Sequence, residues 1–324
     1  MPTQAIRELQ AILKREQNNE LLKKVFFLAY DPFTQFYQRK IPKYEKNNTP
    51  HAASLASMLP SLNDLSGRVV TGNAAIDRLT AILEAVCGTE SEVIERIIKK
   101  DLKCGASEST ANKIWPGLIH EYPCMLCTPF DEKVMKKFNF PAYAQLKMDG
   151  MRFNAIVKDG KCEFRSRNGK EIDLLGNLEM EFIVMAGGQD LVFDGELLVN
   201  DKGVILDRQT GNGILNKAVK GTISDLEAHK VHATVWDVID YETFKQGKGK
   251  LSYQTRFMVL ENMSLPRKIH LVESKVVASL EEAEAIFKEY LAQGQEGIIL
   301  KDLSGIWQNK RSKTQIKFKG ELEC

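Results

Sequence analysis

The residues that decide the fold run from Ala142 to Ser166 and read AYAQLKMDGMRFNAIVKDGKCEFRS. Within this stretch, short runs rich in β-branched and aromatic residues predict strands at Ala142–Lys147, Phe153–Lys158 and Cys162–Ser166. Asp159-Gly160 stands between the last two runs, and Asp-Gly is a pair that two-residue hairpin turns favour. The stretch therefore predicts an antiparallel sheet.

A lysine stands where the first of these strands ends. The run Lys147-Met148-Asp149-Gly150-Met151-Arg152 has the pattern K-x-D-G-x-R, which average composition produces in a chain of this length roughly 0.005 times. Gly150 can turn the chain and hold Lys147 and Arg152 at the rim of the sheet, where functional residues commonly lie. The plain structural alternative is a charged hairpin with Lys147 and Asp149 in solvent.

The periodicity of the sequence changes near Cys127. Before this residue, apolar side chains recur at helical spacing, as in Ile76, Leu79, Ile82, Leu83 and Val86. Asn73 is expected to cap that helix and Gly88 to end it, while Thr89 with Glu92 predicts a capping box for the next helix. We therefore expect an all-α domain over residues 1–127.

Strand patterns alternate with turns after Cys127. Further strands are expected at Leu191–Val199, Val231–Val238 and Gly297–Lys301. A helix capped by Ser279 and Glu282 and stopped by Gly294 is expected among them. The second domain, residues 128–324, is therefore expected to be mixed α/β with antiparallel sheets, which makes the chain a multi-domain protein.

Length and composition agree with two globular domains. The chain has 324 residues, of which 43% are apolar and 27% charged, and its net charge is +2. These values exclude disordered, collagen-like and coiled-coil proteins. No apolar run approaches the roughly 18 residues of a membrane span, and the N-terminus lacks the layout of a signal peptide. We expect a cytoplasmic protein with no membrane partner.

Six scattered cysteines are typical of a reduced protein. Cys124 and Cys127 have C-x-x-C spacing, and Cys104 and His120 lie upstream as further possible zinc ligands. A zinc ribbon normally shows a second such pair, which this chain lacks. The favoured interpretation is small side chains in the core, with zinc as the alternative.

Charged residues recur beside the later predicted strands. The motifs are Ser166-Arg167-Asn168-Gly169, Phe193-Asp194-Gly195-Glu196, Val235-Trp236-Asp237, Glu296-Gly297-Ile298-Ile299-Leu300-Lys301 and Lys317-Phe318-Lys319. With the K-x-D-G-x-R run, their order resembles the nucleotidyltransferase superfamily of ATP-dependent DNA ligases, RNA ligases and messenger-RNA capping enzymes. A likeness to the DNA ligases of T-even bacteriophages extends into the first half, at Thr71-Gly72-Asn73-Ala74 and Trp115-Pro116-Gly117-Leu118-Ile119. RNA ligases and capping enzymes do not share that half.

The resemblance implies an ATP-dependent DNA ligase that uses ATP and Mg²⁺ on nicked double-stranded DNA. Lys147 would take AMP from ATP as a covalent lysine–AMP intermediate and pass it to the 5′-phosphate at the nick, and the 3′-hydroxyl would then displace AMP. The residues implied around the nucleotide are Gln145, Leu146, Lys147, Arg152, Arg167, Glu196, Trp236, Arg311, Lys317 and Lys319.

Individual roles follow from the same resemblance. Arg152 and Glu196 would hold the ribose, and Trp236 would stack on adenine. Arg167 would touch phosphate, and Arg311 would contact ATP. Main-chain groups of Gln145 and Leu146 would face the adenine edge. Trp236 could instead be a core aromatic residue, and Arg311 a solvated turn residue.

The residue types fit this chemistry on physical grounds. A lysine amine must be neutral to attack phosphorus, and its reference pKa of about 10.4 leaves little free amine at pH 7. The cations Arg152, Lys317 and Lys319 would disfavour the ammonium form and stabilise charge on an attacked phosphate. Glu196 and Glu296 would supply the oxygen ligands that Mg²⁺ prefers.

Contacts with DNA are expected in both halves. In the helical half, Gly72-Asn73 and Gly105-Ala106-Ser107 lie near predicted helix starts, whose free amides bind phosphate. In the second half, residues 208–224 contain no acidic residue. Arg208, Lys217 and Lys220 could follow the backbone of a duplex there, and an ordinary basic loop is the alternative.

Ligases of this family continue past the position of Lys319 into an oligonucleotide-binding barrel, whereas this chain ends at Cys324. A C-terminal OB-fold domain is therefore expected to be absent, which favours a fragment with slow adenylylation. The alternatives are a DNA-binding fragment without covalent chemistry, and an RNA ligase or capping-type enzyme. We expect a monomer, located in the host cytoplasm if the protein is viral.

Overall fold

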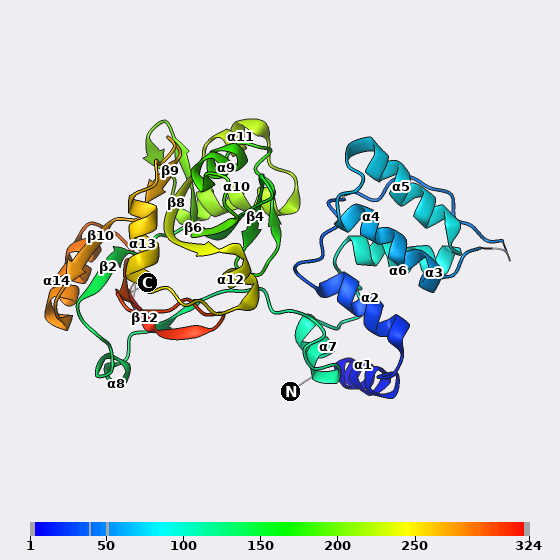
Figure 1. The fold of residues 1–324 in the computed structure, drawn as a ribbon, viewed down its shortest axis with the longest axis horizontal. Coiled ribbons are helices and arrows are strands. Elements are labelled where there is room, and N and C mark those ends of the chain that lie inside the picture. The colour runs from blue at the N-terminus through cyan, green and yellow to red at the C-terminus, as the bar shows by residue number, and fades with distance from the viewer. Residues whose placement is uncertain (1–3, 39, 50–51, 321–324) are drawn as a thin grey trace. The chain divides into compact units, whose positions relative to one another are not determined.

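The computed structural model describes residues 4–38, 40–49 and 52–320. The chain divides into two compact units, Met1–Tyr122 and Pro123–Cys324 (Figure 1). The first unit is built from the helices α1 (Gln4–Arg15), α2 (Glu20–Tyr30), α3 (Leu55–Met58), η1 (Leu59–Leu62), α4 (Asn63–Ser66), α5 (Gly72–Ala85), α6 (Gly88–Ile98) and α7 (Glu108–Ile114). Their apolar faces meet in one core that includes Phe26, Leu79, Ile97 and Trp115.

The start of α5 differs from the sequence prediction. Thr71 is the N-cap and the helix begins at Gly72, so Asn73 lies in the first turn instead of capping it. Gly72 has φ +57, and a Cβ atom built on it would meet no atom within 4 Å. The side-chain cap that Asn73 was expected to provide is absent, because the N-cap position is occupied by Thr71, which forms no side-chain cap bond.

The junction of α5 and α6 also corrects the sequence prediction. Gly88 begins α6 instead of ending α5, and Cys87 is the N-cap without a side-chain cap bond, so the predicted Thr89 and Glu92 box is wrong. The chain turns at the extended residues Val86 and Cys87. These two residues form β-bridges with Ala53 and Asn47, and this long-range pairing overrides the local capping signals.

The second unit is mixed α/β and contains two sheets. The five-stranded sheet has the order β1-β12-β11-β2-β10, formed by β1 (Leu126–Pro129), β12 (Arg311–Lys319), β11 (Gly297–Asp302), β2 (Ala142–Leu146) and β10 (Ser274–Val277). The seven-stranded sheet has the order β5-β4-β3-β6-β8-β9, with β7 paired to β6. Its strands are β3 (Met151–Lys158), β4 (Lys161–Ser166), β5 (Glu171–Ile172), β6 (Leu191–Asp201), β7 (Val204–Ile205), β8 (Val231–Asp240) and β9 (Ile269–Leu271).

Helices pack on both sheets of the second unit. They are α8 (Glu132–Met135), α9 (Glu179–Ala186), α10 (Arg208–Lys220), α11 (Asp225–His229), α12 (Tyr241–Gln246), α13 (Tyr253–Glu261) and α14 (Leu280–Ala292). α9 packs on β3 and β4, α10 on β6, α13 on β8, and α14 on β11. α10 forms within the segment for which a basic loop was the alternative. Among the described residues, no helix has the length and apolar character needed to cross a membrane.

Local turn and capping signals in this unit are confirmed. Asp159 and Gly160 have φ +49 and +70, the left-handed conformation that the predicted hairpin turn requires. Ser279 accepts a hydrogen bond from the amide of Glu282 at the start of α14. The strands predicted from composition are present as β2, β3, β4, β6, β8 and β11, each within three residues of the expected ends.

Candidate active site

Lys147 follows β2 directly and is held by the neighbouring strand β11. Its amide donates to the carbonyl oxygen of Gly297 (3.0 Å). Its ammonium group pairs with the carboxylate of Glu296, and the other oxygen of that carboxylate lies 3.3 Å from Nζ of Lys319 on β12. The side chain of Lys147 is 21% exposed and that of Glu296 only 10%. Three adjacent strands therefore bring two lysines to one carboxylate, a set we call the lysine cluster.

The carboxylate of Glu296 is ionised in this cluster. Burial opposes its charge, but the hydrogen bonds and positive charges of Lys147 and Lys319 outweigh burial and lower the pKa of Glu296. The sequence predicted the cations Arg152, Lys317 and Lys319 beside Lys147 and gave Glu296 the role of a metal ligand, not of an ion-pair partner of Lys147. The structure adds an anion, so attack by Lys147 requires the loss of both a proton and this ion pair.

Gly150 packs the turn after Lys147 against β6. A Cβ atom on Gly150 would lie 2.2 Å from the carbonyl oxygen of Leu197, so only glycine fits. The amide of Gly150 donates to Oε1 of Glu196 (3.1 Å). The predicted turn is present, although close approach of the backbone, and not a left-handed conformation, is what requires glycine there.

Glu196 and Arg152 face each other across β3 and β6. Burial raises the pKa of Glu196 to about 7, against the opposing effects of the Gly150 amide, Arg152 and Lys147. Arg152 donates to both oxygens of Asp194, at 3.0 and 2.7 Å. Asp194 is 3% exposed and was not among the predicted site residues, although its motif was recognised. It fixes the guanidinium group that the sequence analysis placed at the ribose.

Trp236 lies on β8 beside two cations. Cζ of Arg152 is 5.8 Å and Nζ of Lys301 is 5.5 Å from the centre of its ring. Gln145 is buried, with its side-chain amide donating to Ser274 (3.0 Å) and its carbonyl oxygen accepting from Tyr253 (3.0 Å). Lys301 and Tyr253 were not predicted as site residues, although Lys301 belongs to the recognised motif Glu296–Lys301; the contacts of both residues depend on the tertiary structure.

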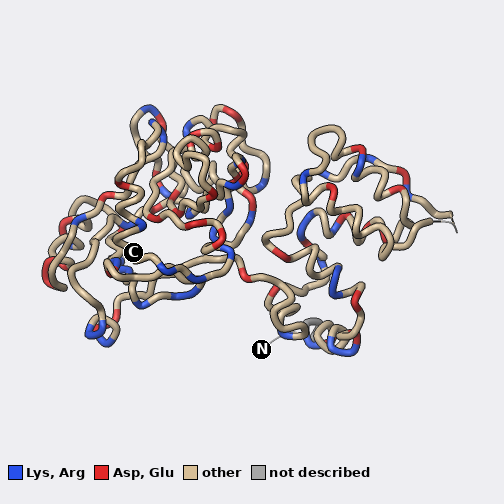
Figure 2. Tube along the Cα trace, in the orientation of Figure 1, with Lys and Arg blue, Asp and Glu red and all other residues tan. Residues whose placement is uncertain are grey.

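The remaining predicted nucleotide residues lie at separate places. The amide of Leu146 donates to the carbonyl oxygen of Glu273 (3.0 Å), so this main-chain donor is already used. Arg167 is exposed just after β4. On β12, where Figure 2 shows a row of basic residues, Lys317 pairs in register with Ile299. Arg311 begins the same strand at the end opposite to Lys319, and its guanidinium donates to the carbonyl oxygen of Cys127.

The chain is similar to known proteins in sequence and in fold. The family model described as the ATP dependent DNA ligase domain matches residues 124–319. The chain belongs to the ATP-dependent DNA ligase family. The DNA ligases of Enterobacteria phages T4 and T6 are each 38% identical to it over 362 residues, covering 98% of this chain and 73% of theirs. The solved structure Pmar-Lig_PreS3 shares its fold, with a TM-score of 0.57 at 22% identity, over 96% of this chain and 74% of that chain.

Two glycine turns in the first unit of this ligase-family chain were predicted to contact DNA. One is Gly72-Asn73 at the start of α5. In the other, Gly105 has φ +77 and open space where a Cβ would lie. The carbonyl oxygen of Ala106 accepts from the hydroxyl of Tyr30 (2.9 Å), and Ser107 is the N-cap of α7. Both turns therefore lie at helix N-termini; α5 has no side-chain cap bond, whereas in α7 the Ser107 hydroxyl accepts from the amide of Thr110 (3.4 Å).

The basic residues predicted to follow DNA in the second unit lie on α10, and two of them form ion pairs. Arg208 pairs with Asp149 of the K-x-D-G-x-R run, at 3.0 Å. Lys217 pairs with Glu227. Lys220 is exposed in the last turn of α10. Only Arg208 is thereby connected to the turn that carries Lys147.

The zinc alternative receives no support from the structure. Among the described residues there is no group of three or more His, Cys, Asp or Glu side chains that could hold a metal ion. Burial raises the pKa of Cys124 and of Cys127, which keeps both thiols protonated. His120 instead lies 2.6 Å from the buried carboxylate of Asp31.

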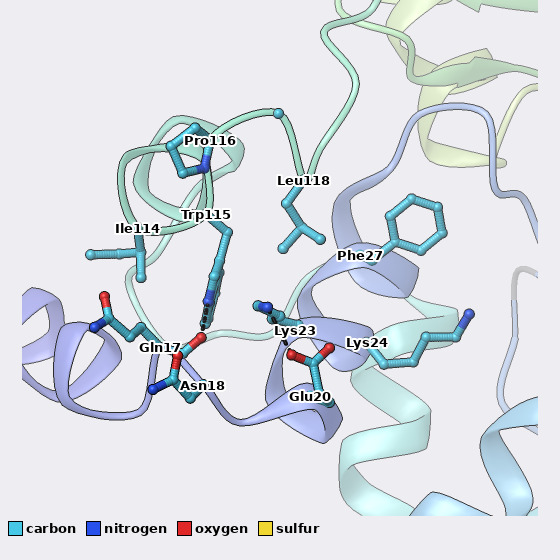
Figure 3. Close-up of a pocket in the computed structure, with 11 residues that line it drawn as sticks. Gln17, Asn18, Glu20, Lys23, Lys24, Phe27, Ile114, Trp115, Pro116 and Leu118 are labelled. Atoms are coloured by element: carbon cyan, nitrogen blue, oxygen red, sulfur yellow. Dashed lines mark hydrogen bonds and ion pairs between the residues drawn. The ribbon is translucent and has the colours of Figure 1, made fainter.

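A cavity of about 680 Å³ lies in the first unit, between the α1–α2 loop, the first turns of α2 and the turn after α7 (Figure 3). The indole N–H of Trp115 donates to the carbonyl oxygen of Gln17 (2.7 Å), and Phe27 forms another wall. Lys23 on its rim is paired with Glu20 (2.8 Å). None of the predicted nucleotide residues lines this cavity, so the candidate active site is the lysine cluster and its surroundings.

Proposed function

We propose that this chain seals nicks in double-stranded DNA with ATP, and that Lys147 is its nucleophile. The observation that carries the proposal is the lysine cluster at the adjoining ends of β2, β11 and β12. The cluster lies within the residues that match the ligase family model. A half-buried carboxylate, Glu196, and a fixed guanidinium group, that of Arg152, accompany it on the other sheet.

In the first step, the neutral amine of Lys147 attacks the α-phosphorus of ATP. An N–P bond forms, the P–O bond to pyrophosphate breaks, and the proton of the ammonium group has already left. Lys317 and Lys319 carry the positive charge that stabilises the attacked phosphate. Glu296 holds Lys147 in position through their ion pair until the nucleotide binds.

The next two steps use the same phosphorus chemistry on DNA. The 5′-phosphate at the nick attacks the lysine–AMP phosphorus, so that the N–P bond breaks and AMP caps the DNA end. The 3′-hydroxyl then attacks the 5′-phosphate and AMP leaves. Arg167 and Arg311 would contact the phosphates, and their guanidinium groups suit phosphate oxygens.

The base and ribose would lie between Trp236 and the Arg152–Glu196 pair. Arg152, fixed by Asp194, and Glu196 offer a donor and an acceptor to ribose hydroxyls. Trp236 offers a ring for adenine, although two cations already lie near it. The Leu146 amide is already used within the sheet, and the side chain of Gln145 is bonded to Ser274 and Tyr253, so contact of either residue with the base edge would require one of these bonds to be exchanged.

Mg²⁺ would be held by Glu196 and Glu296, whose carboxylate oxygens are the donors that this ion prefers. Two carboxylates fit Mg²⁺ when phosphate oxygens of ATP and water complete its coordination. The bound ion would neutralise charge on the phosphates. Glu296 contacts Lys147 and Lys319 in the structure, so a carboxylate that held the ion would no longer be available to both lysines.

We further propose that the first unit is an all-α DNA-binding domain and the second an adenylyltransferase domain. The glycine turns at Gly72 and Gly105 support the first role, because helix N-terminal amides bind phosphate without net positive charge. On α10, Arg208, Lys217 and Lys220 would add contacts to the duplex from the second unit. The two contact sets would grip the nicked duplex together.

The deciding experiment is covalent labelling with ATP carrying ³²P at the α-phosphate, in the presence of Mg²⁺. We expect label on the denatured wild-type protein and none on Lys147→Ala, while Lys133→Ala, which changes an exposed lysine on α8, labels normally. Circular dichroism checks that both variants are folded. Wild-type protein that never becomes labelled would favour the alternative of a DNA-binding fragment without covalent chemistry.

A sealing assay on nicked DNA and nicked RNA then shows which of the two polynucleotides the protein joins. Joining of nicked DNA supports a DNA ligase. Exclusive joining of RNA would favour the RNA ligase alternative and contradict the proposed role of the first unit.

A further inference from the structure

Three histidines and two further basic residues gather at the paired strands β8 and β9 (Figure 1), and none of the steps above assigns them a role. Nδ1 of His232 on β8 lies 3.0 Å from Nε2 of His270 on β9, and the planes of the two rings differ by only 8°. Nζ of Lys268 lies 3.4 Å from Nδ1 of His229. We call these four residues and Arg267 the basic cluster.

The basic cluster has few acidic neighbours. The four charged or titratable groups that act most strongly on His232 are all basic: His270, Lys268, Arg267 and His229. Within the part of the chain that the structure describes, neither Arg267 nor Lys268 forms an ion pair. Glu181 on α9 is influenced by Lys268 but forms no ion pair with it. A cluster of basic groups without carboxylate partners favours the binding of an anion.

The histidine pair keeps one nitrogen of each ring for a ligand. The bond between Nδ1 of His232 and Nε2 of His270 requires a proton on only one of these two atoms. Among the described residues, Nε2 of His232 and Nδ1 of His270 have no hydrogen-bond partner. His270 is exposed and His232 is half-buried, so a ligand can approach the pair from solvent.

Strand register places the pair on the face of the sheet that carries Glu196. Glu196 on β6 pairs with Thr234 on β8, and Thr234 pairs with His270 on β9. Register partners point to the same face, and so does His232, which lies two residues from Thr234 on the same strand. The opposite face packs in the core of the unit. With neighbouring strands about 4.8 Å apart, His270 lies about 10 Å from Glu196 across the sheet.

We propose that the basic cluster is an anion-binding site for a backbone phosphate of the nicked DNA. Each strand of a duplex carries one phosphate per roughly 3.4 Å of helix axis, so a site about 10 Å from Glu196 reaches a phosphate about three nucleotides from the nick. This inference rests on the proposed function, because it takes nicked DNA as the substrate and Glu196 as the position of the ribose of AMP.

Binding of a phosphate at this site should take up a proton. Burial lowers the pKa of His232, and so do the positive charges of the rest of the basic cluster. A phosphate beside the ring would favour its imidazolium form, whose Nδ1–H donates to His270 and whose Nε2–H donates to the phosphate. Because binding then includes proton uptake, the affinity for DNA should rise as the pH falls. The contact is therefore expected to be stronger at pH 6 than at pH 8.

The test measures the affinity of the full chain for a fluorescent nicked duplex by anisotropy, without ATP or Mg²⁺, at several salt concentrations. At pH 6 the double variant His232→Gln/His270→Gln should bind about 3- to 5-fold more weakly than wild type. The slope of log affinity against log salt should also be smaller by about 0.9, because one phosphate fewer is neutralised. At pH 8 the two proteins should differ little. The matched control is Lys158→Gln, which removes a positive charge at the last residue of β3 in the same sheet and should bind like wild type at both pH values.

Replacement of single phosphates by uncharged methylphosphonates locates the contact. At pH 6 one substitution, about two to four nucleotides from the nick, should weaken binding by wild type as much as the double variant does. The same substitution should not weaken binding by the double variant, because its partner is already gone. His270→Gln, a change at an exposed position, provides the same comparison if the double variant does not fold.

Three outcomes would overturn the inference. They are equal affinities of wild type and the double variant at pH 6, a loss of the same size at pH 6 and pH 8, and methylphosphonate losses that persist unchanged in the double variant. If the double variant instead weakens inhibition of labelling by pyrophosphate and leaves DNA affinity unchanged, the cluster binds the leaving group and not DNA.

Failure of the proposed function looks different from these outcomes. Wild-type protein would then take no label from ATP and seal no nick, whatever residues occupy positions 232 and 270. The comparison of DNA affinities requires neither ATP nor sealing, so it would still decide whether the basic cluster binds a backbone phosphate.

Discussion

Replacing Glu196 by glutamine should stabilise the second unit at alkaline pH while abolishing adenylylation. Burial raises the pKa of Glu196 from 4.5 to about 7. A carboxyl group whose pKa is raised by folding stabilises the folded state fully below the unfolded pKa, and this contribution is lost as pH rises through the folded pKa. Ionisation of Glu196 therefore lowers the free energy of unfolding of the wild-type protein as the pH rises from about 4.5 to 7.

The loss of unfolding free energy can be calculated from the pKa shift of Glu196. At 1.36 kcal/mol per pKa unit, the full effect is about 3 kcal/mol, of which about 2.5 kcal/mol falls between pH 5 and pH 8. Glutamine has nearly the same shape, its carbonyl oxygen can still accept from the Gly150 amide (3.1 Å to Glu196 in the wild type), and it carries no charge at either pH. Glu196→Gln should thus gain about 2.5 kcal/mol on the wild type between pH 5 and pH 8.

The assay is urea unfolding at pH 5 and pH 8 in a Trp115→Phe background, so that Trp236 and Trp307 report on the second unit alone. Glu242→Gln, an exposed position on α12, controls for the loss of one negative charge and should not reproduce the pH-dependent gain. Labelling with ATP at pH 8 should fall severely in Glu196→Gln. A stability difference between Glu196→Gln and wild type that is the same at both pH values would refute the reasoning, because burial would then not oppose the charge of Glu196.

Three further predictions concern other parts of the site. Glu296→Gln should reduce labelling severely and raise the Mg²⁺ concentration needed for half-maximal labelling; an unaltered Mg²⁺ dependence would exclude Glu296 as a ligand. Asp237→Asn leaves Arg256 buried without a carboxylate and should cost about 3–5 kcal/mol in urea unfolding, whereas a loss below 1 kcal/mol would show that the pair is dispensable. A truncated chain comprising Pro123–Cys324 should label like the full chain but bind nicked duplex more weakly and with a flatter salt dependence; equal affinity in titrations at two salt concentrations would contradict a DNA-binding role for the first unit.

Elements with strong local signals were predictable from sequence. The Asp159-Gly160 turn adopts the two left-handed conformations that its residues favour, and the Ser279 cap starts α14 as expected. These signals act between residues that are close in sequence, so tertiary contacts have little opportunity to change them.

Elements in which local and distant interactions compete were predicted less well. Gly88 has the composition of a helix stop, but bridges from Val86 to Ala53 and from Cys87 to Asn47 precede it, and Gly88 is the first residue of α6. Gly211 and Gly213 weaken the helical pattern of α10, yet the helix forms against β6, where a Cβ atom built on Gly211 would lie 3.9 Å from Val199. In both places packing between distant segments decides the boundary.

By itself the sequence predicted which side chains would carry the chemistry: a lysine, two glutamates and a group of cations, in or beside the strands that local composition predicts. Only the tertiary structure decided which of them meet. Glu296 stands 149 residues from Lys147 and faces it because β11 pairs with β2. Burial and charge contacts set the ionisation of these groups, and both depend on distances in space that the order of residues along the chain does not contain.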